Sequence, residues 1–426
     1  MSNKRHLVIV GTGVAGCSAA LSARASDSEV EITLIGEEPH LPYDRTHLSK
    51  QQLASDADWD SALLIPGVTF KQKGIELRTG VRVTAIEHDT HRLILENKEE
   101  LRYDKLILAT GSIVRPIPST WGPINHDDLH CIRVAEDAAR LRSAFASAKK
   151  IVVIGSGLIG LEVAAAARER GIDVTVIGTG SRILMRSCDV LTAERLESVH
   201  RDRGVNFRLG ISVDKIRKMD SGELEVSLTD GSVLLADDVV VGIGVLPNTT
   251  LAESAGLEVN NGISVDAYGQ TSCQDIFAAG EVASFKASDS PLPFRLESWR
   301  HAQDHGDVVG ANAVSHEMRV YEKPSSFWSD QFDHRIQGVG AIPDTPHDVF
   351  VRSYDNGTHI SFCIGTDQKL LAVVGFDCSK DVNAAGRLVG CPINDPALML
   401  ADKSQPLGPI VKSILKSMKQ EDSRHD

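Results

Sequence analysis

The chain has 426 residues, of which 42% are hydrophobic and 24% charged, an ordinary composition for a globular protein. At roughly 150 residues per domain, this length predicts two to four domains. The 45 basic and 58 acidic residues give a formal net charge of −13, which argues against a dedicated nucleic-acid binder. The seven cysteines include no closely spaced pair, so a disulfide scaffold and a structural zinc site are excluded and a reducing compartment is indicated.

The N-terminal segment predicts a strand, a glycine turn and a helix. Residues His6–Val10 form an apolar run typical of a buried parallel strand, and a helix of small residues is expected over Cys17–Arg24. The turn between them is Gly11-Thr-Gly-Val-Ala-Gly16, the dinucleotide-binding fingerprint. The uncharged stretch Leu7–Ala23 also has features of a signal peptide. The apolar region of a signal peptide does not need three glycines at this spacing, whereas a strand, turn and helix does, so we interpret the stretch as part of the fold.

Each glycine of this turn has an expected role. Gly11 permits the tight turn, Gly13 lets the backbone approach a pyrophosphate, and Gly16 lets the helix pack on the strand. The helix N-terminus supplies N–H groups to the phosphates. A second strand, Glu31–Ile35, is followed by Glu37 and Glu38, and either carboxylate would accept a hydrogen bond from a ribose hydroxyl.

The same pattern recurs in the middle of the chain. A strand over Lys150–Ile154 leads into Gly155-Ser-Gly157-Leu-Ile-Gly160, then a helix over Leu161–Arg170 capped by Gly171, and a strand over Asp173–Ile177. Two such turns in one chain imply two dinucleotides. The combination that this pattern favours is a flavin dinucleotide with a nicotinamide dinucleotide.

The two units differ where the ribose is recognised. The second strand is followed by Gly178-Thr-Gly-Ser-Arg182, without the acid that would bind an NAD ribose and repel a 2′-phosphate. Arg182 and two hydroxyls stand there instead, which leaves NADPH or dual use open. An equally weighted interpretation is that Gly178 marks only a turn and that selectivity lies elsewhere.

Further elements are expected along the rest of the chain. Hairpins are predicted over 81–97 and 223–235, and strands end in turns near residues 111, 248 and 281. The C-terminal region predicts a small α+β domain with strands over 335–342, 348–354, 359–365 and 370–376 and a helix over 379–389. Residues 412–426 are expected to be a frayed helix and a charged tail.

Several motifs together resemble a known family. They are Pro42-Tyr-Asp-Arg45 with Leu48-Ser-Lys50, Ala109-Thr-Gly111, Gly242–Asn248, Ile276–Ala283, Glu297-Ser-Trp299 with Ala302, and Phe327–Asp333. In this order they resemble the FAD-dependent ferredoxin reductases that serve bacterial aromatic-ring dioxygenases and haem-thiolate monooxygenases. Apoptosis-inducing factor and rubredoxin reductases are more distant relatives. The glutathione-reductase branch needs a Cys-x4-Cys pair, and residues 40–60 contain no cysteine.

The resemblance implies the residues of two cofactor sites. The FAD site would comprise Gly11, Gly13, Ala15, Gly16, Glu37, Arg45, Lys50, Val83, Ala109, Thr110, Gly111, Gly280 and Glu281, with Trp299 by the pyrimidine end of the isoalloxazine. The nicotinamide side would comprise Gly155, Gly157, Leu158, Ile159, Gly160, Glu162 and Arg182, and Gly244 and Trp328 complete the cofactor-binding set. Lys50 and Glu162 would pair near flavin N5 as the catalytic residues.

Three positions depart from the family pattern. Thr46-His47 replaces two prolines, so the turn before Lys50 is less rigid and His47 is a candidate to titrate near the flavin. Glu281 replaces an aspartate and is one methylene longer. Gly178 replaces the nicotinamide-ribose acid.

The sequence therefore predicts an α/β, glutathione-reductase-like fold with two Rossmann-like dinucleotide-binding domains and a C-terminal α+β domain. The expected divisions are an FAD domain over 1–113 and 246–320, an NAD(P)H domain over 114–245, a C-terminal domain over 321–411 and a charged tail over 412–426.

The predicted function is a cytoplasmic flavoprotein reductase. It would transfer electrons from NADH or NADPH through FAD to a [2Fe–2S] ferredoxin that feeds an oxygenase, with no metal, nucleic acid or membrane partner. Monomer and dimer both stay open. The alternatives are an NAD(P)H oxidase, a rubredoxin-type reductase, or a flavin-bound interaction protein regulated by its redox state.

Overall fold

The computed structural model describes residues 4–54, 59–285, 294–342, 345 and 347–422. The chain divides into two compact units. Unit 1 comprises Met1–His47, Ala57–Arg115 and Val245–Lys323, and unit 2 comprises Leu48–Asp56, Pro116–Gly244 and Pro324–Asp426. Both units are assembled from segments far apart in sequence.

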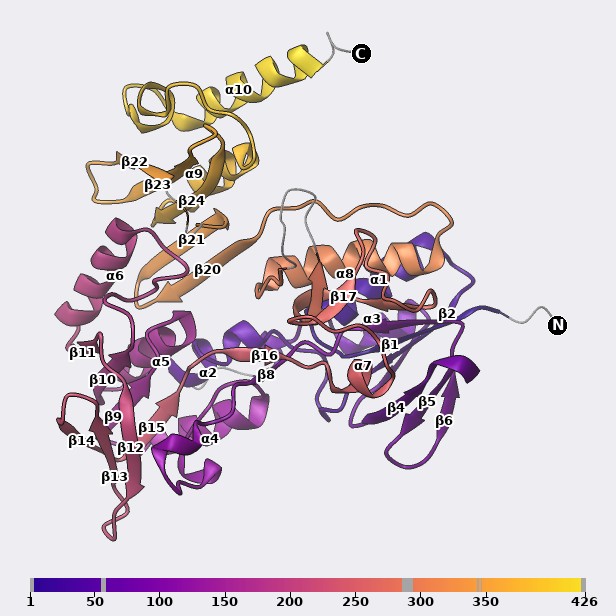
Figure 1. Ribbon diagram of the computed structural model, residues 1–426, viewed down its shortest axis with the longest axis horizontal. Helices are drawn as coiled ribbons and strands as arrows, with labels where there is room; N and C mark the ends of the chain where they lie inside the picture. The colour runs from indigo at the N-terminus through magenta and orange to yellow at the C-terminus, as the bar shows by residue number, and fades with distance from the viewer. Residues whose placement is uncertain (1–3, 55–58, 286–293, 343–344, 346, 423–426) are drawn as a thin grey trace. The chain divides into compact units, whose positions relative to one another are not determined.

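Unit 1 is built on a five-stranded sheet in which every neighbouring pair is parallel (Figure 1). Its apolar strands are buried because both faces are covered. One face packs against α1 (Val14–Ser26) and α8 (Trp299–Val314), and the other packs against residues of a small antiparallel sheet and of α7 (Thr250–Ser254). In sheet order the strands are β18 (Ile276–Ala278), β7 (Lys105–Leu108), β1 (His6–Val10), β2 (Glu31–Ile35) and β3 (Ile75–Arg78).

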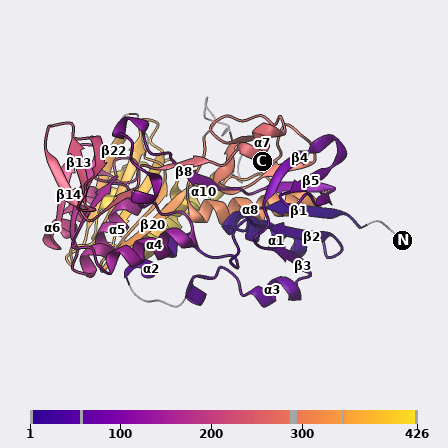
Figure 2. The same cartoon turned by 90° about the horizontal axis from the view of Figure 1, so that it is seen from below.

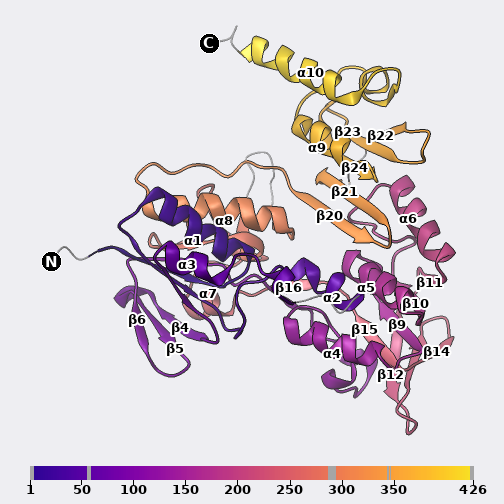
Figure 3. The same cartoon turned by 180° about the vertical axis from the view of Figure 1, so that it is seen from behind.

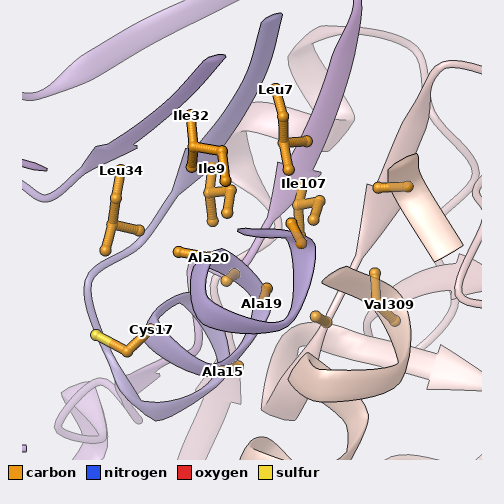
Figure 4. Close-up of a cluster of buried hydrophobic side chains, with 14 of the residues drawn as sticks. Leu7, Ile9, Ala15, Cys17, Ala19, Ala20, Ile32, Leu34, Ile107 and Val309 are labelled. Atoms are coloured by element: carbon orange, nitrogen blue, oxygen red, sulfur yellow. The ribbon is translucent and has the colours of Figure 1, made fainter. Parts of the chain in front are cut away.

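Helices α1 and α8 pack at very short range, which accounts for two of the 35 glycines in the chain. Figure 4 shows Ala15, Ala19 and Val309 at this contact below the strands. A Cβ on Gly306 would lie 2.3 Å from the Ala15 carbonyl oxygen, and one on Gly310 would lie 2.2 Å from the Ala19 carbonyl oxygen. Only glycine therefore lets the two backbones approach so closely.

Smaller elements complete unit 1. A three-stranded antiparallel sheet confirms the hairpin predicted over 81–97, and β16 pairs with β8 while β17 pairs with β19. These elements are β4 (Val83–Glu87), β5 (Arg92–Leu95), β6 (Glu100–Arg102), β8 (Ser112–Val114), β16 (Val245–Pro247), β17 (Ile263–Val265), β19 (Ala283–Phe285) and α3 (Gly67–Gln72). Single 3₁₀ turns lie at Arg45–His47, Trp59–Ala62, His88–Thr90 and Gly280–Val282.

The first part of unit 2 repeats the doubly wound pattern. Its parallel sheet has the order β11 (Val205–Leu209), β10 (Asp173–Gly178), β9 (Lys150–Ile154) and β15 (Asp238–Val241). The helices of this part are α2 (Gln51–Ala54), α4 (Ala135–Phe145), α5 (Leu158–Glu169) and α6 (Val190–Asp202). An antiparallel sheet of β12 (Val213–Lys218), β13 (Leu224–Leu228) and β14 (Val233–Ala236) contains the hairpin predicted over 223–235 (Figure 2).

The C-terminal part of unit 2 is an antiparallel five-stranded sheet covered by helices (Figure 3). Its strand order is β20 (Ser326–Gln331), β21 (His334–Gly340), β24 (Leu370–Phe376), β23 (His359–Gly365) and β22 (His347–Ser353). Helices α9 (Ser379–Ala385) and α10 (Leu407–Asp422) and the short π-helical segment Ala397–Ala401 follow in sequence. Leu407, Val411 and Ile414 of α10 are buried in the core of this part.

The bounds of some elements differ from the expectations. The frayed helix expected from residue 412 is part of α10, which begins earlier, at Leu407, and whose apolar side packs on the sheet. The helices expected from Cys17 and Leu161 begin three residues earlier, at Val14 and Leu158, since the last glycine of each turn is already helical. Strand β20 was not predicted, because Ser326–Gln331 lacks a continuous apolar run.

Candidate cofactor sites

The first glycine turn, in unit 1, has a backbone that only glycine permits. Gly11 has φ 115°, and a Cβ there would lie 2.1 Å from the Ala109 carbonyl oxygen. A Cβ on Gly16 would lie 1.8 Å from the Gly11 carbonyl oxygen. By contrast, a Cβ on Gly13 would meet nothing within 4 Å. The first and last glycines therefore serve packing, and the middle one faces open space.

The second turn, in unit 2, repeats this arrangement. Gly155 has φ 122°, and its Cβ would lie 2.1 Å from the Gly242 carbonyl oxygen. A Cβ on Gly160 would lie 2.1 Å from the Gly155 carbonyl oxygen, whereas Gly157 again has open space in front of it. Ala109 and Gly242 thus occupy corresponding positions, each just beyond the strand that pairs with the first strand of its unit.

Both turns fit a dinucleotide pyrophosphate. Gly13 and Gly157 are the N-caps of α1 and α5, and no side chain caps the helix at either position. The first N–H groups of each helix are therefore left to an anion at the positive end of the helix dipole. The open space in front of the middle glycine is where the phosphates of such a ligand would lie.

The strand ends of the two units differ in the residue that follows the corresponding glycine. Val10 pairs with Ile35 in unit 1 and Ile154 pairs with Ile177 in unit 2, so the next residues, Gly36 and Gly178, correspond. A Cβ on Gly36 would lie 2.2 Å from Thr12 Oγ1, and one on Gly178 would lie 2.5 Å from Ser156 Oγ. The residue that follows is an acid in unit 1, Glu37, and a hydroxyl in unit 2, Thr179.

The two acids after β2 have separate partners in unit 1. Glu38 pairs with Arg45 Nη2 at 2.5 Å and accepts from the Tyr43 hydroxyl, while Glu37 is exposed and lies 3.1 Å from Arg82 Nε. Burial disfavours the Arg45 cation, but the charges of Tyr43, Glu38 and Glu281 outweigh this effect and raise the pKa of Arg45. Glu37 is therefore the more exposed of the two carboxylates.

Two further loops of unit 1 carry predicted FAD residues. Thr110 Oγ1 donates to the Asn248 carbonyl at 2.7 Å, and Gly111 has φ 65°. Glu281 lies on the 3₁₀ turn after β18, where Ser112 Oγ donates to its Oε2 at 3.0 Å. The carboxylate is thus held by β8, next to the end of β7.

The remaining unit 1 residues differ in accessibility. Ala15 is buried, and a Cβ on Gly280 would lie 2.6 Å from its Cβ. Trp299 is half-buried at the start of α8, after the N-cap Ser298. Val83 is 7% exposed and packs in the core beneath the sheet, so only its backbone can face a ligand.

A buried histidine cluster beside Gly280 was not predicted. His305 Nδ1 accepts from the Gly280 N–H at 3.2 Å, and His301 Nδ1 lies 2.9 Å from the Tyr321 hydroxyl. The two imidazoles stack with centroids 5.1 Å apart. Burial lowers the pKa of His301 to about 4 and holds that of His305 well below its usual value, so both are neutral at pH 7. Their helical spacing of four residues was the available signal in the sequence.

In unit 2, Lys50 and Glu162 form the expected pair. Lys50 Nζ lies 2.8 Å from Glu162 Oε1, and the side chains are 16% and 2% exposed. Lys50 precedes α2, and Glu162 lies in the second turn of α5. Ser49 and Ser329, which the sequence did not identify, also donate to Glu162. The structure thus places Lys50 with Glu162 in unit 2, whereas the other predicted FAD residues lie in unit 1.

The other predicted residues of unit 2 lie on three segments. Leu158 and Ile159 open α5, and Ile159 is 44% exposed. Gly244 has φ 98° and no neighbour that would meet a Cβ. Trp328 is half-buried on β20, next to Ser329.

Arg182 has a local structural role in the loop after β10. Its guanidinium donates to the carbonyl oxygens of Ile183, Met185 and Cys188 at 3.0 to 3.4 Å. These hydrogen bonds hold the loop in place and use both Nη1 and Nη2 of the guanidinium. The exposed cation of this loop is Arg186, which the sequence interpretation had not selected.

Three further features concern the cysteines, possible metal ligands and long helices. All seven cysteines are free. Within the described residues, no cluster of three or more His, Cys, Asp or Glu could hold a metal ion. No helix in the described part of the chain is long and apolar enough to cross a membrane.

Comparison with known proteins decides the family. A family model described as pyridine nucleotide-disulphide oxidoreductase matches residues 5–306, and one described as reductase C-terminal matches residues 326–411. The chain belongs to the pyridine nucleotide-disulphide oxidoreductase family. It is an oxidoreductase, and the predicted use of FAD and NAD(P)H is confirmed at the level of the family.

Individual relatives extend over nearly the whole chain. The ferredoxin–NAD(+) reductase component of the anthranilate 1,2-dioxygenase system of Burkholderia cepacia is 38% identical over 93% of this chain and 96% of its own. Rhodocoxin reductase of Rhodococcus erythropolis is 38% identical, with 90% and 89% covered. The reductase in the covalent putidaredoxin reductase–putidaredoxin complex superposes with a TM-score of 0.90 at 32% identity, covering 97% of this chain and 99% of that one. The resemblance and the fold class predicted from the sequence are confirmed.

Proposed function

We propose that this protein is an NAD(P)H:ferredoxin reductase that supplies a [2Fe–2S] ferredoxin of an oxygenase system. The observation that carries the proposal is the likeness, over both matched regions, to reductase components whose names state this role. The two glycine turns supply one site for each dinucleotide. Bound FAD would accept a hydride from NAD(P)H and pass electrons singly to an iron–sulfur partner.

The residues of the chain bind and position rather than act as nucleophiles. In unit 1, Gly13 and the first N–H groups of α1 would hold the FAD pyrophosphate, and Glu37 its ribose. Glu281, held by Ser112, would face the polyol chain, and the other predicted FAD residues would line the site. In unit 2, Gly157 and α5 would hold the nicotinamide dinucleotide, with Lys50 and Glu162 beside the reacting rings.

We also propose that the second site accepts NADPH as well as NADH. No residue from Gly178 to Ser187 carries a carboxylate, so nothing in this loop repels a 2′-phosphate. Because Arg182 is occupied by carbonyl oxygens, Thr179, Ser181 and the exposed Arg186 are the groups proposed to face the phosphate. A preference for NADH above roughly a hundredfold in kcat/KM, about 2.7 kcal/mol, would contradict dual use.

The proposed location is the cytoplasm, because seven free cysteines suit a reducing compartment. The proposed functional divisions are the FAD domain over 1–113 and 246–320, the NAD(P)H domain over 114–245 and the C-terminal domain from 321, which now includes α10. Monomeric and dimeric states both agree with the proposal.

The test compares acceptors for the same enzyme. We expect NADH or NADPH to reduce a [2Fe–2S] ferredoxin rapidly while oxygen is consumed slowly. Oxygen consumption as fast as ferredoxin reduction would indicate an NAD(P)H oxidase instead. Slow flavin reduction with a long-lived charge-transfer complex would indicate a redox-regulated interaction protein, and efficient transfer only to rubredoxin would indicate the rubredoxin-type reductase.

A further inference from the structure

The short turn that carries Glu281 lies directly against the first glycine turn of unit 1. This Glu281 turn spans Gly280–Val282, and Gly280 has φ 77°. A Cβ on Gly280 would lie 2.6 Å from the Cβ of Ala15, which belongs to the glycine turn Gly11–Gly16. The two turns are therefore packed together with no room for a side chain at Gly280.

Side chains from other segments of unit 1 hold the Glu281 turn. His305 Nδ1 on α8 accepts a hydrogen bond from the Gly280 N–H at 3.2 Å. Arg295 Nη1 donates to the Glu281 carbonyl oxygen at 3.1 Å, and Ser112 Oγ donates to Glu281 Oε2 at 3.0 Å. The first two contacts hold the backbone of the turn, and the third holds the carboxylate.

The hydrogen bond to Gly280 fixes the protonation of His305. A backbone N–H can only donate, so Nδ1 must offer a lone pair and the ring proton lies on Nε2. A protonated imidazole has two donors and no acceptor, so it would leave the Gly280 N–H unpaired. Burial, followed by the charge of neighbouring His301, holds the pKa of His305 well below its usual value. The neutral ring that the hydrogen bond requires is therefore the form present at pH 7.

The position of the His305 ring is set by its helix and by aromatic packing. The ring centroid lies 5.1 Å from that of His301 and 4.9 Å from that of Tyr321. The next residue of α8 is Gly306, which lets this helix approach α1 closely. Helix position and aromatic packing together therefore hold Nδ1 at one place against the Glu281 turn.

We propose that His305 is a positioning residue for FAD binding, which accepts the Gly280 N–H and thereby keeps the Glu281 carboxylate directed at the polyol chain of the flavin. The inference rests on the proposed function, which assigns FAD to unit 1 and the polyol contact to Glu281. Without this acceptor the buried Gly280 N–H would need another partner, because an unpaired buried N–H is unfavourable. The turn would then move and displace Glu281, so FAD affinity depends on a residue that acts through the turn.

Release of FAD from the purified holoenzyme on serial dilution, followed by flavin fluorescence, gives the dissociation constant that tests the proposal. We expect His305→Leu to raise this constant about tenfold, which is about 1.4 kcal/mol, because leucine fills the site without an acceptor. His305→Asn has nearly the shape of His305→Leu but offers an amide oxygen near the position of Nδ1, so it should restore most of the affinity. His305→Met has only a weak acceptor and provides a second variant in case His305→Leu folds poorly.

Tyr321→Phe is the matched control within the same cluster. It removes the hydroxyl that lies 2.9 Å from His301 Nδ1 and keeps the aromatic ring beside His305. We expect this variant to have a lower melting temperature and an unchanged FAD dissociation constant. Because the hydrogen bond to Gly280 is intact in this variant, it separates positioning of the turn from general stability of the cluster.

Several results would overturn the inference. They are an unchanged FAD dissociation constant in His305→Leu, FAD binding by His305→Asn as weak as by His305→Leu, or an equal loss of affinity in Tyr321→Phe. Absence of FAD from the unmutated protein would overturn both the proposed function and this inference. FAD binding without ferredoxin reduction would overturn the proposed function alone.

Discussion

The glycine turns of units 1 and 2 share a backbone but differ in the side chains around it. In both, a Cβ on the first or the last glycine would lie 1.8 to 2.1 Å from a carbonyl oxygen, and the middle glycine faces open space. The strand end that follows carries Glu37 in unit 1 and Thr179 in unit 2. The second residue after the last glycine of the turn is Ser18 in unit 1 and Glu162 in unit 2.

This difference shows which features belong to phosphate binding and which to the individual cofactor. The glycines and the helix start are common, so they serve the pyrophosphate. The packing of the two helices also differs. Helix α1 approaches α8 through glycine, whereas α5 places a buried carboxylate among hydroxyls from two other segments. In unit 2 the helix after the glycine turn therefore carries a buried carboxylate with polar partners, and the corresponding helix of unit 1 does not.

The largest expected effect comes from an acid at the middle glycine of each turn. Gly13→Glu should weaken FAD binding at least a hundredfold, about 2.7 kcal/mol, because a carboxylate would occupy the phosphate position. Gly157→Glu should leave FAD bound and weaken NAD(P)H binding to the same extent. FAD content after purification and nicotinamide titration measure the two effects, and each variant is the control for the other. Loss of both cofactors from either variant would contradict the assignment.

A smaller effect is expected from adding a methyl group at the close contact between α1 and α8 in unit 1. Gly310→Ala would bring a Cβ to 2.2 Å from the Ala19 carbonyl. We expect it to lower the free energy of unfolding by about 2 kcal/mol, since overpacking of a close contact costs about 1–3 kcal/mol. Denaturant unfolding measures the loss. Gly408→Ala is the matched control, because its Cβ would meet nothing within 4 Å, and an equal loss there would refute the argument.

A substitution at Thr179 should change the preference between NADPH and NADH by about tenfold. Thr179→Glu would restore an acid at the strand end of unit 2, so we expect kcat/KM for NADPH to fall about tenfold relative to NADH, roughly 1.4 kcal/mol. Steady-state kinetics with both nucleotides measure the ratio. Glu37→Thr should leave this ratio unchanged, since Glu37 follows the corresponding strand of the other unit. An unaltered NADPH rate in Thr179→Glu would show that selectivity lies elsewhere.

A further effect concerns acid stability. Because the pKa of His200 is about 4 in the folded protein, against 6.5 for a free histidine side chain, the unfolded chain binds more protons between these pH values. Stability is fully present above pH 6.5 and falls as the pH drops toward 4, by about 1.4 kcal/mol per pH unit for one histidine. His200→Gln should flatten the pH dependence of the melting temperature between pH 6.5 and 5. The pKa of His301 in unit 1 is lowered in the same way, so some pH dependence should persist in this variant. A melting temperature that depends more steeply on pH in His200→Gln would contradict the prediction.

Much of the fold followed from local patterns, and the polar network around Glu162 did not. The strands His6–Val10 and Lys150–Ile154 and both glycine turns are contiguous signals, and their spacing predicted them. Ser329 reaches Glu162, and His200 reaches Gln331, only through tertiary packing, and a serine in a strand has no pattern that indicates its partner. The occupation of Arg182 by carbonyl oxygens likewise depends on the path of the loop. Helix α10 was expected to be frayed and to begin only at residue 412, because its charged residues conceal the buried spacing of Leu407, Val411 and Ile414.

The central claim is that the chain binds one FAD and a nicotinamide donor at separate sites and passes electrons from the donor through the flavin to a ferredoxin. An anaerobic titration of the purified protein tests it most directly. We predict one FAD per chain, reduced completely by one equivalent of NADH or NADPH and reoxidised by a [2Fe–2S] ferredoxin. Two FAD molecules per chain, or a flavin that neither nucleotide reduces, would contradict it.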